Sequence, residues 1–79
     1  MQILYMATSG PSDATRASIP LHLAVNGSVE AGHRIGVVLA GDATSLLKRD
    51  TRDSIEGLGV PPMRDLFAKA RQHGLPIYV

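Results

Sequence analysis

Three short apolar segments, far apart in the chain, constrain the fold more than any other feature of the sequence. Each is rich in aliphatic or β-branched residues and is bounded by glycine or proline, a pattern typical of buried strands. The intervening segments are long enough to cross from one strand to a parallel neighbour. The sequence therefore predicts three parallel strands near residues 2–7, 34–40 and 76–79.

The segments between the strands predict helices. Asp13 and Asp42 stand where a carboxylate can cap the first turn of a helix. The last helix has the most regular pattern, with apolar residues on one face and charged residues opposite. Its expected start is preset by two prolines and its end by Gly74. The expected helices span about residues 13–31, 42–47 and 61–74.

The alternation of strands and helices predicts an α/β fold. Because all three strands are apolar on both faces, the expected arrangement is a three-layer sandwich, with a parallel sheet covered by helices on each side. The predicted strand order is 2-1-3, with strand one central, as in flavodoxin-like proteins. Residues 1–79 are expected to form a single domain.

Composition excludes several function classes. Eight Lys and Arg residues balance seven Asp and Glu residues, so nothing in the net charge of +1 indicates nucleic acid or an anionic membrane as a partner. The 79 residues contain no cysteine, which excludes disulfides and thiol chemistry within them. The N-terminus lacks the basic and long apolar regions of a signal peptide, so a soluble cytoplasmic protein is expected.

Two loops that follow strands are the candidate ligand-binding sites. The first could offer backbone amides and hydroxyls to an anion at the start of a helix, with Arg16 as a countercharge. In the second, Asp42 could contact a ligand. Helix capping by Asp13 and Asp42 is the simpler interpretation of both loops. The candidate binding residues are Thr8, Ser9, Gly10, Ser12, Arg16, Gly41, Asp42 and Thr44.

Catalytic and metal sites are not indicated. No combination of nucleophile, base and orienting residue can be assembled from the sequence. The chain has three histidines, but their spacing matches no local metal motif, so neither a metal nor another cofactor is expected. These histidines are His22, His33 and His73.

Most of the chain resembles one known family. The stretches that carry the resemblance are "ILYMATSGPSDATRASIPLHLAVNG", "AGHRIGVVLAGDATSLL" and "GVPPMRDLFAKARQHGLPIYV". They are similar to the DsrE/DsrF-like proteins, small flavodoxin-like α/β proteins linked to sulfur relay. Members that resemble this chain usually place a cysteine directly after the "PIYV" strand and continue with more of the sheet. The resemblance therefore implies a DsrE-like fold that continues past Val79.

Three functions remain open from the sequence. The first is a sulfur-relay or small-ligand binding module that lacks its reactive cysteine in this chain, with a sulfur-relay protein as a possible partner. The second is a structural or oligomerising subunit without catalytic activity. An anion-binding or hydrolytic enzyme is the third. An apolar edge at the last strand also predicts a homo-oligomer, because another chain would have to cover that edge.

Overall fold

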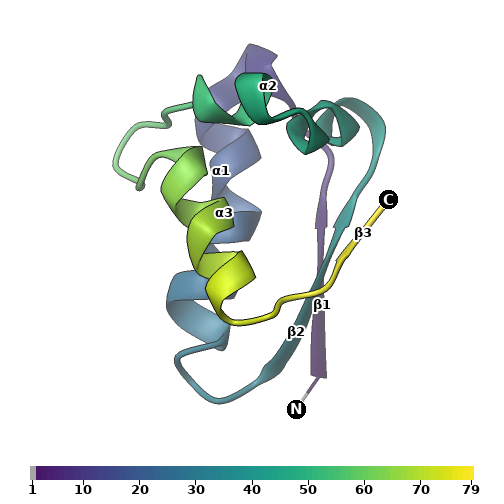
Figure 1. Ribbon diagram of the computed structural model, residues 1–79, viewed down its shortest axis with the longest axis vertical. Coiled ribbons are helices and arrows are strands. Elements are labelled where there is room, and N and C mark those ends of the chain that lie inside the picture. The colour runs from purple at the N-terminus through teal and green to yellow at the C-terminus, as the bar shows by residue number, and fades with distance from the viewer. Residues whose placement is uncertain (1) are drawn as a thin grey trace.

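The computed structural model describes residues 2–79 (Figure 1). The first predicted helix begins with a short 3₁₀ turn and ends in a π-helix, and the other predicted helices lie close to their expected places. The strands are β1 (Gln2–Ala7), β2 (Arg34–Leu39) and β3 (Ile77–Tyr78). The helices are η1 (Pro11–Asp13), α1 (Ala14–Leu23), η2 (Ala24–Ser28), η3 (Gly41–Leu47), α2 (Arg49–Asp53) and α3 (Met63–Gln72).

Within residues 2–79 the strands form one parallel sheet of three strands, as the sequence predicts. β1 pairs with β2 along its whole length, from Gln2 opposite Arg34 to Ala7 opposite Leu39. The β3 ladder is shorter, with Val37 opposite Ile77. The α/β class is therefore confirmed.

The predicted strand order 2-1-3 is wrong, because the order is β1-β2-β3 with β2 in the centre. The central strand β2 is buried at most positions, whereas in the edge strand β1 Leu4 and Met6 are 62% exposed. Gly36 in the middle of β2 leaves room for its neighbours. An added Cβ there would lie 3.2 Å from the side chains of Leu4 and Tyr78.

Because the strand order differs from the predicted one, one of the three expected layers is not formed. Parallel crossovers are almost always right-handed, so two successive crossovers in the same direction place their helices on the same face of the sheet. Figure 1 shows α1 and α3 together on one side of the strands. Within residues 2–79 the other face of the sheet carries no helix, and the expected covering on both sides is not found.

The core lies between the sheet and these helices. The stripe predicted for α3 is confirmed, because Met63, Leu66, Phe67 and Ala70 are all buried. They meet the inward side chains of β2 and the buried face of α1. Burying a large aliphatic side chain contributes about 1.5–3 kcal/mol, so these contacts stabilise the fold. The other large buried side chains include Leu21, Val25, Val37, Leu39 and Leu46.

Polar contacts fasten the end of the first helical segment to its neighbours. The Lys69 ammonium of α3 donates to Glu30 Oε1 at 2.6 Å and also to Asn26 Oδ1. On the other side, the hydroxyls of Tyr5 in β1 and Ser28 in η2 lie 2.7 Å apart. The hydrogen bond from Lys69, followed by its positive charge, lowers the pKa of Glu30 from its usual value. The π-helix is thus held between β1 and α3.

We predict that Lys69→Met returns the pKa of Glu30 toward its usual value, as measured by NMR titration of the Glu30 carboxylate. Because the folded pKa is lowered, the pair stabilises the protein above the unfolded-state pKa of Glu30. That stabilisation is lost as the pH falls through the lowered folded pKa. Unfolding curves of the native chain should show this loss of stability at low pH, and those of Lys69→Met should show a smaller loss.

Arg71→Met is the matched control, since Arg71 is an exposed cation on the same helix. It should leave the Glu30 titration unchanged. Equal Glu30 pKa values in the native chain and in Lys69→Met would contradict the assignment.

Candidate functional site

The two candidate loops lie side by side at the carboxyl edge of the sheet. β1 and β2 are adjacent and parallel, so the loops that follow them leave the sheet at the same end. The Ala40 amide donates to the Ala7 carbonyl at 2.9 Å, which extends the ladder to the start of both loops. Gly10 is buried against the Asp42 backbone, where even a Cβ would overlap the Asp42 carbonyl oxygen. The structure therefore brings the two predicted segments into contact.

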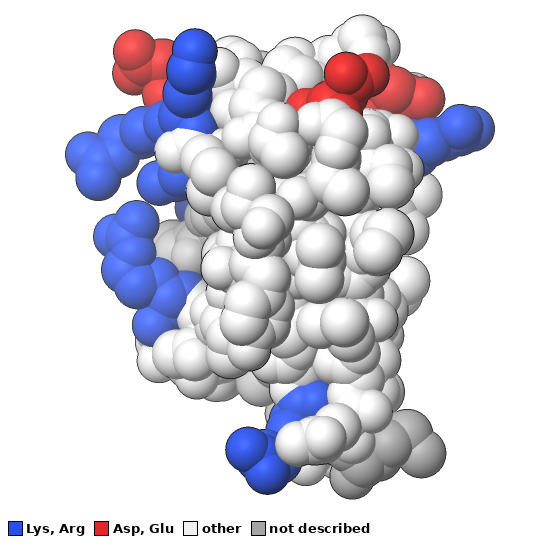
Figure 2. All heavy atoms as spheres, turned by 90° about the vertical axis from the view of Figure 1, so that its right-hand side faces the viewer, with Lys and Arg blue, Asp and Glu red and all other residues white. Residues whose placement is uncertain are grey.

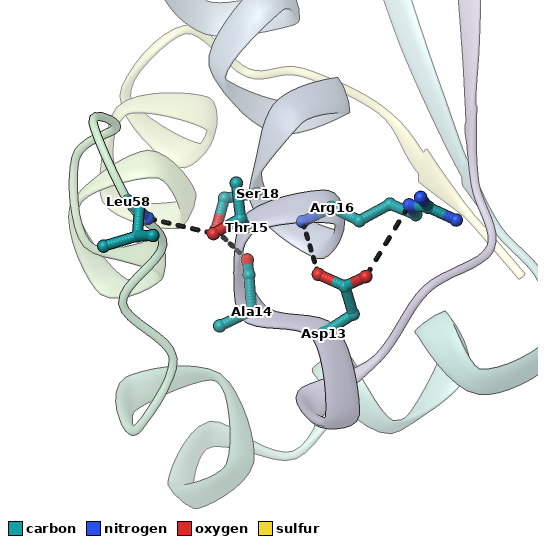
Figure 3. A network of polar contacts seen from close by, with 6 residues as sticks. All are labelled: Asp13, Ala14, Thr15, Arg16, Ser18 and Leu58. Atoms are coloured by element: carbon teal, nitrogen blue, oxygen red, sulfur yellow. Dashed lines mark hydrogen bonds and ion pairs between the residues drawn. The ribbon is translucent and has the colours of Figure 1, made fainter.

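At the first loop, Asp13 performs the capping role that the sequence indicates. Its carboxylate accepts a hydrogen bond from the Arg16 amide at 3.1 Å, at the N-terminus of α1 (Figure 3). The same carboxylate lies 3.6 Å from the Arg16 guanidinium Nε. An anion at this helix start would compete with Asp13 for both groups. The geometry therefore favours capping over anion binding at the start of α1.

At the second loop, the expected cap does not form. Asp42 lies inside the first turn of η3, Ala40 occupies the N-cap position, and no side-chain capping bond is found for this helix within residues 2–79. The cause is Gly41, whose φ of +56° starts the 3₁₀ turn one residue earlier than the sequence suggests. Thr44 Oγ1 donates to the Gly41 carbonyl at 2.9 Å, so its hydroxyl stabilises the turn itself. The Asp42 residue remains exposed.

The charge at this edge does not favour an anionic ligand. Asp13 and Arg16 form a pair, which leaves the exposed Asp42 as a further negative charge on the adjoining loop. Thr8 and Ser12 are exposed and add hydroxyl groups. Such a surface suits a partner that offers cationic groups or hydrogen-bond donors. It does not have the residues of a general acid and base pair held together.

The cleft expected between the first and third strands is not formed, because β2 separates them. In doubly wound sheets a crevice opens where the strand order reverses. Within residues 2–79 the order runs in one direction without a reversal. The candidate site is therefore an open surface formed by two loops.

Sequence reasoning missed two features. Thr15 Oγ1 accepts a hydrogen bond from the Leu58 amide at 3.0 Å, which holds the loop before α3 against the start of α1 (Figure 3). The second feature is an open hollow of about 720 Å³ at the amino edge of the sheet, lined in part by Arg34, His73 and Tyr78. In the sequence, Gly74 and Pro76 indicate the bend beside this hollow. That β2 borders the hollow follows only from the strand order.

The histidines do not form a metal site. His22 Nδ1 lies 3.0 Å from Asn26 Nδ2, within hydrogen-bond distance on the same helical segment. His73 is the C-cap residue of α3. Among residues 2–79 no group of three or more potential ligands comes together to hold a metal ion. Over the same residues, no helix is long and apolar enough to span a membrane.

The fold and the edge loops define a small parallel α/β protein whose polar surface lies at the ends of its strands. Comparison with known families places it more closely: the model of the DsrE/DsrF-like family matches residues 1–79, and the chain belongs to that family. No curated protein and no solved structure matches the chain significantly.

We predict that Gly10→Ala separates the two candidate loops. The new Cβ would overlap the backbone of Asp42, which cannot move without disturbing η3. Such overpacking typically costs about 1–3 kcal/mol, and urea unfolding would measure the loss. Gly27→Ala is the control, because nothing lies within 4 Å of its added Cβ. Equal midpoints for the two variants would show that Gly10 and Asp42 are not in close contact.

Proposed function

We propose that this chain serves sulfur relay as a binding module that contacts a relay partner without carrying the sulfur on these residues. Membership of the DsrE/DsrF-like family supports the link to sulfur relay. The absence of cysteine from the 79 residues is the observation that favours a binding module over a sulfur carrier. A persulfide is formed on a cysteine thiolate, so none of these residues can hold one.

The carboxyl-edge loops are the proposed contact surface. They combine the exposed Asp42 with the hydroxyls of Thr8, Ser9 and Ser12, on backbone held by the β1–β2 ladder. A partner with a basic surface would be steered toward Asp42 and could donate hydrogen bonds to the hydroxyls. If the module binds a small neutral or cationic ligand instead of a partner protein, that ligand would contact the same residues.

A structural or oligomerising subunit is the second candidate function. The observation that favours it is the uncovered face of the sheet, on which Leu4, Met6 and Tyr78 are each more than half exposed. Contiguous apolar surface of this kind commonly marks a protein–protein interface. This candidate needs no chemistry at the carboxyl-edge loops.

We expect no stable sulfur adduct when the purified chain is incubated with glutathione persulfide and its intact mass is measured. No thiolate within the 79 residues can attack the donor or retain its sulfane sulfur. A DsrE-type protein that contains a cysteine serves as the positive control. A reproducible gain of one sulfur atom by this chain would overturn the proposal.

The binding part is tested with a small sulfur-carrier protein whose cysteine bears a persulfide. Titrated into the ¹⁵N-labelled chain, it should shift amide signals of residues 8–16 and 40–45. Asp42→Asn should weaken this binding by about 1.5-fold to fivefold, the range for loss of one exposed charge pair. Glu56→Gln removes an exposed carboxylate on another loop and should have no effect. Shifts confined to other surfaces would exclude the carboxyl-edge loops as the contact.

A further inference from the structure

An Asn-Gly pair lies inside the first helical segment. Asn26 is the only asparagine in the 79 residues, and Gly27 follows it within η2. This dipeptide is typical of turns rather than helices. It is also a sequence from which the asparagine side-chain amide is readily lost, because glycine has no Cβ to hinder the approach of its own nitrogen. The π-helix therefore contains a reactive pair.

Hydrogen bonds hold the Asn26 side chain on both of its polar atoms. Asn26 Nδ2 lies 3.0 Å from His22 Nδ1, and Asn26 Oδ1 accepts a hydrogen bond from the Lys69 ammonium. The same ammonium pairs with Glu30 Oε1 at 2.6 Å. Gly27 is exposed, and nothing lies within 4 Å of an added Cβ there. Lys69 thus fixes the asparagine side chain, while water reaches the glycine that follows.

We propose that Asn26–Gly27 is a site of spontaneous deamidation and that Lys69 limits its rate by keeping η2 closed. This inference is independent of the sulfur-relay proposal. In a helical turn each amide N–H points along the axis toward the preceding turn, not toward the side chain of the residue before it. The Gly27 nitrogen therefore reaches Asn26 Cγ only when the turn opens. Local openings of this kind occur in native proteins without global unfolding.

The reaction needs no reactant other than water. In the opened turn the Gly27 amide nitrogen loses its proton and attacks Asn26 Cγ. The new N–Cγ bond closes a succinimide ring, the Cγ–Nδ2 bond breaks, and Nδ2 takes up a proton and leaves as ammonia. Water then adds to one of the ring carbonyls and opens the ring. The product is aspartate, or iso-aspartate when the main chain comes to run through Cβ and Cγ. No group is oxidised or reduced.

The two products affect the π-helix differently. Aspartate keeps an oxygen that can accept from Lys69, and it adds a negative charge. Iso-aspartate lengthens the main chain by a methylene group inside the turn. The residues after the turn then change direction, so Ser28 and Glu30 move away from Tyr5 and Lys69. The iso-aspartate form therefore loses the contacts that keep the turn closed in the unmodified chain.

The charged groups near the site lie on the helical side of the molecule. Lys69 contacts both Asn26 and Glu30, and Lys69 and then His73 lower the pKa of Glu30. On the sheet side, the middle of the molecular surface carries no Lys, Arg, Asp or Glu (Figure 2). Lys69 is therefore the cation whose removal should change the site most.

Incubation of the folded chain at mildly alkaline pH tests the proposal. Trypsin releases residues 17–34 as one peptide with a single asparagine, so its mass reports the exchange of NH₂ for OH. Chromatography separates the aspartate and iso-aspartate forms. Lys69→Met should raise the conversion rate about twofold to tenfold, the gain in the opened state when one hydrogen bond is lost. Gly27→Ala should slow the conversion in both backgrounds.

Two control variants separate local opening from other effects. Arg71→Met removes an exposed cation from the same helix and should leave the native rate unchanged. Gly10→Ala lowers global stability at the carboxyl edge of the sheet and should accelerate the reaction less than Lys69→Met does. Equal rates in the native chain and in Lys69→Met, or an equal acceleration by Gly10→Ala, would overturn the role of Lys69. A native chain that stays unmodified while the urea-unfolded chain converts would overturn the site itself.

Discussion

The parallel pairing of β1 with β2 positions the other parts of the molecule. The two strands run level over six residues, so the helical segment between them must return along one face of the sheet. The same ladder brings the loops after both strands to one edge. Gly10 can approach the Asp42 carbonyl only because the strands end together. Helix packing and the candidate site are thus two results of one strand pairing.

The central place of β2 has an equally broad effect on the surface. Because the strand order does not reverse, α1 and α3 share one face, and their apolar stripes are buried in a common core. The opposite face keeps Leu4 and Met6 largely in water, where their potential stabilisation of about 25 cal/mol for each Å² is not realised. A molecule built this way offers surfaces to other molecules more readily than enclosed pockets. Both candidate functions use that property, at different surfaces.

Sequence reasoning worked where one local pattern determined the outcome. The apolar stripe of α3 and the Asp13 cap of α1 depend on residues within a few positions of each other, and both were predicted. Strand order could not be predicted, because the apolar segments of β1 and β2 look alike and the choice depends on packing across the sheet. Asp42 failed as a cap because of the positive φ of Gly41, which the residue types alone do not fix. Lys69 and Glu30, 39 positions apart, have no local signal at all.

The π-helix at the end of the first helical segment determines the directions in which the side chains after it point. Such a turn contains one residue more than an α-helical turn of the same rise, and a residue corresponds to about 100° of rotation. If η2 were a regular α-helix, Ser28 and Glu30 would therefore face other directions, away from the Tyr5 hydroxyl and the Lys69 ammonium. Chain length between residues 24 and 28 is consequently a requirement in addition to the side chains of Asn26 and Ser28. A one-residue deletion in this turn would uncouple the first crossover from both neighbours at once.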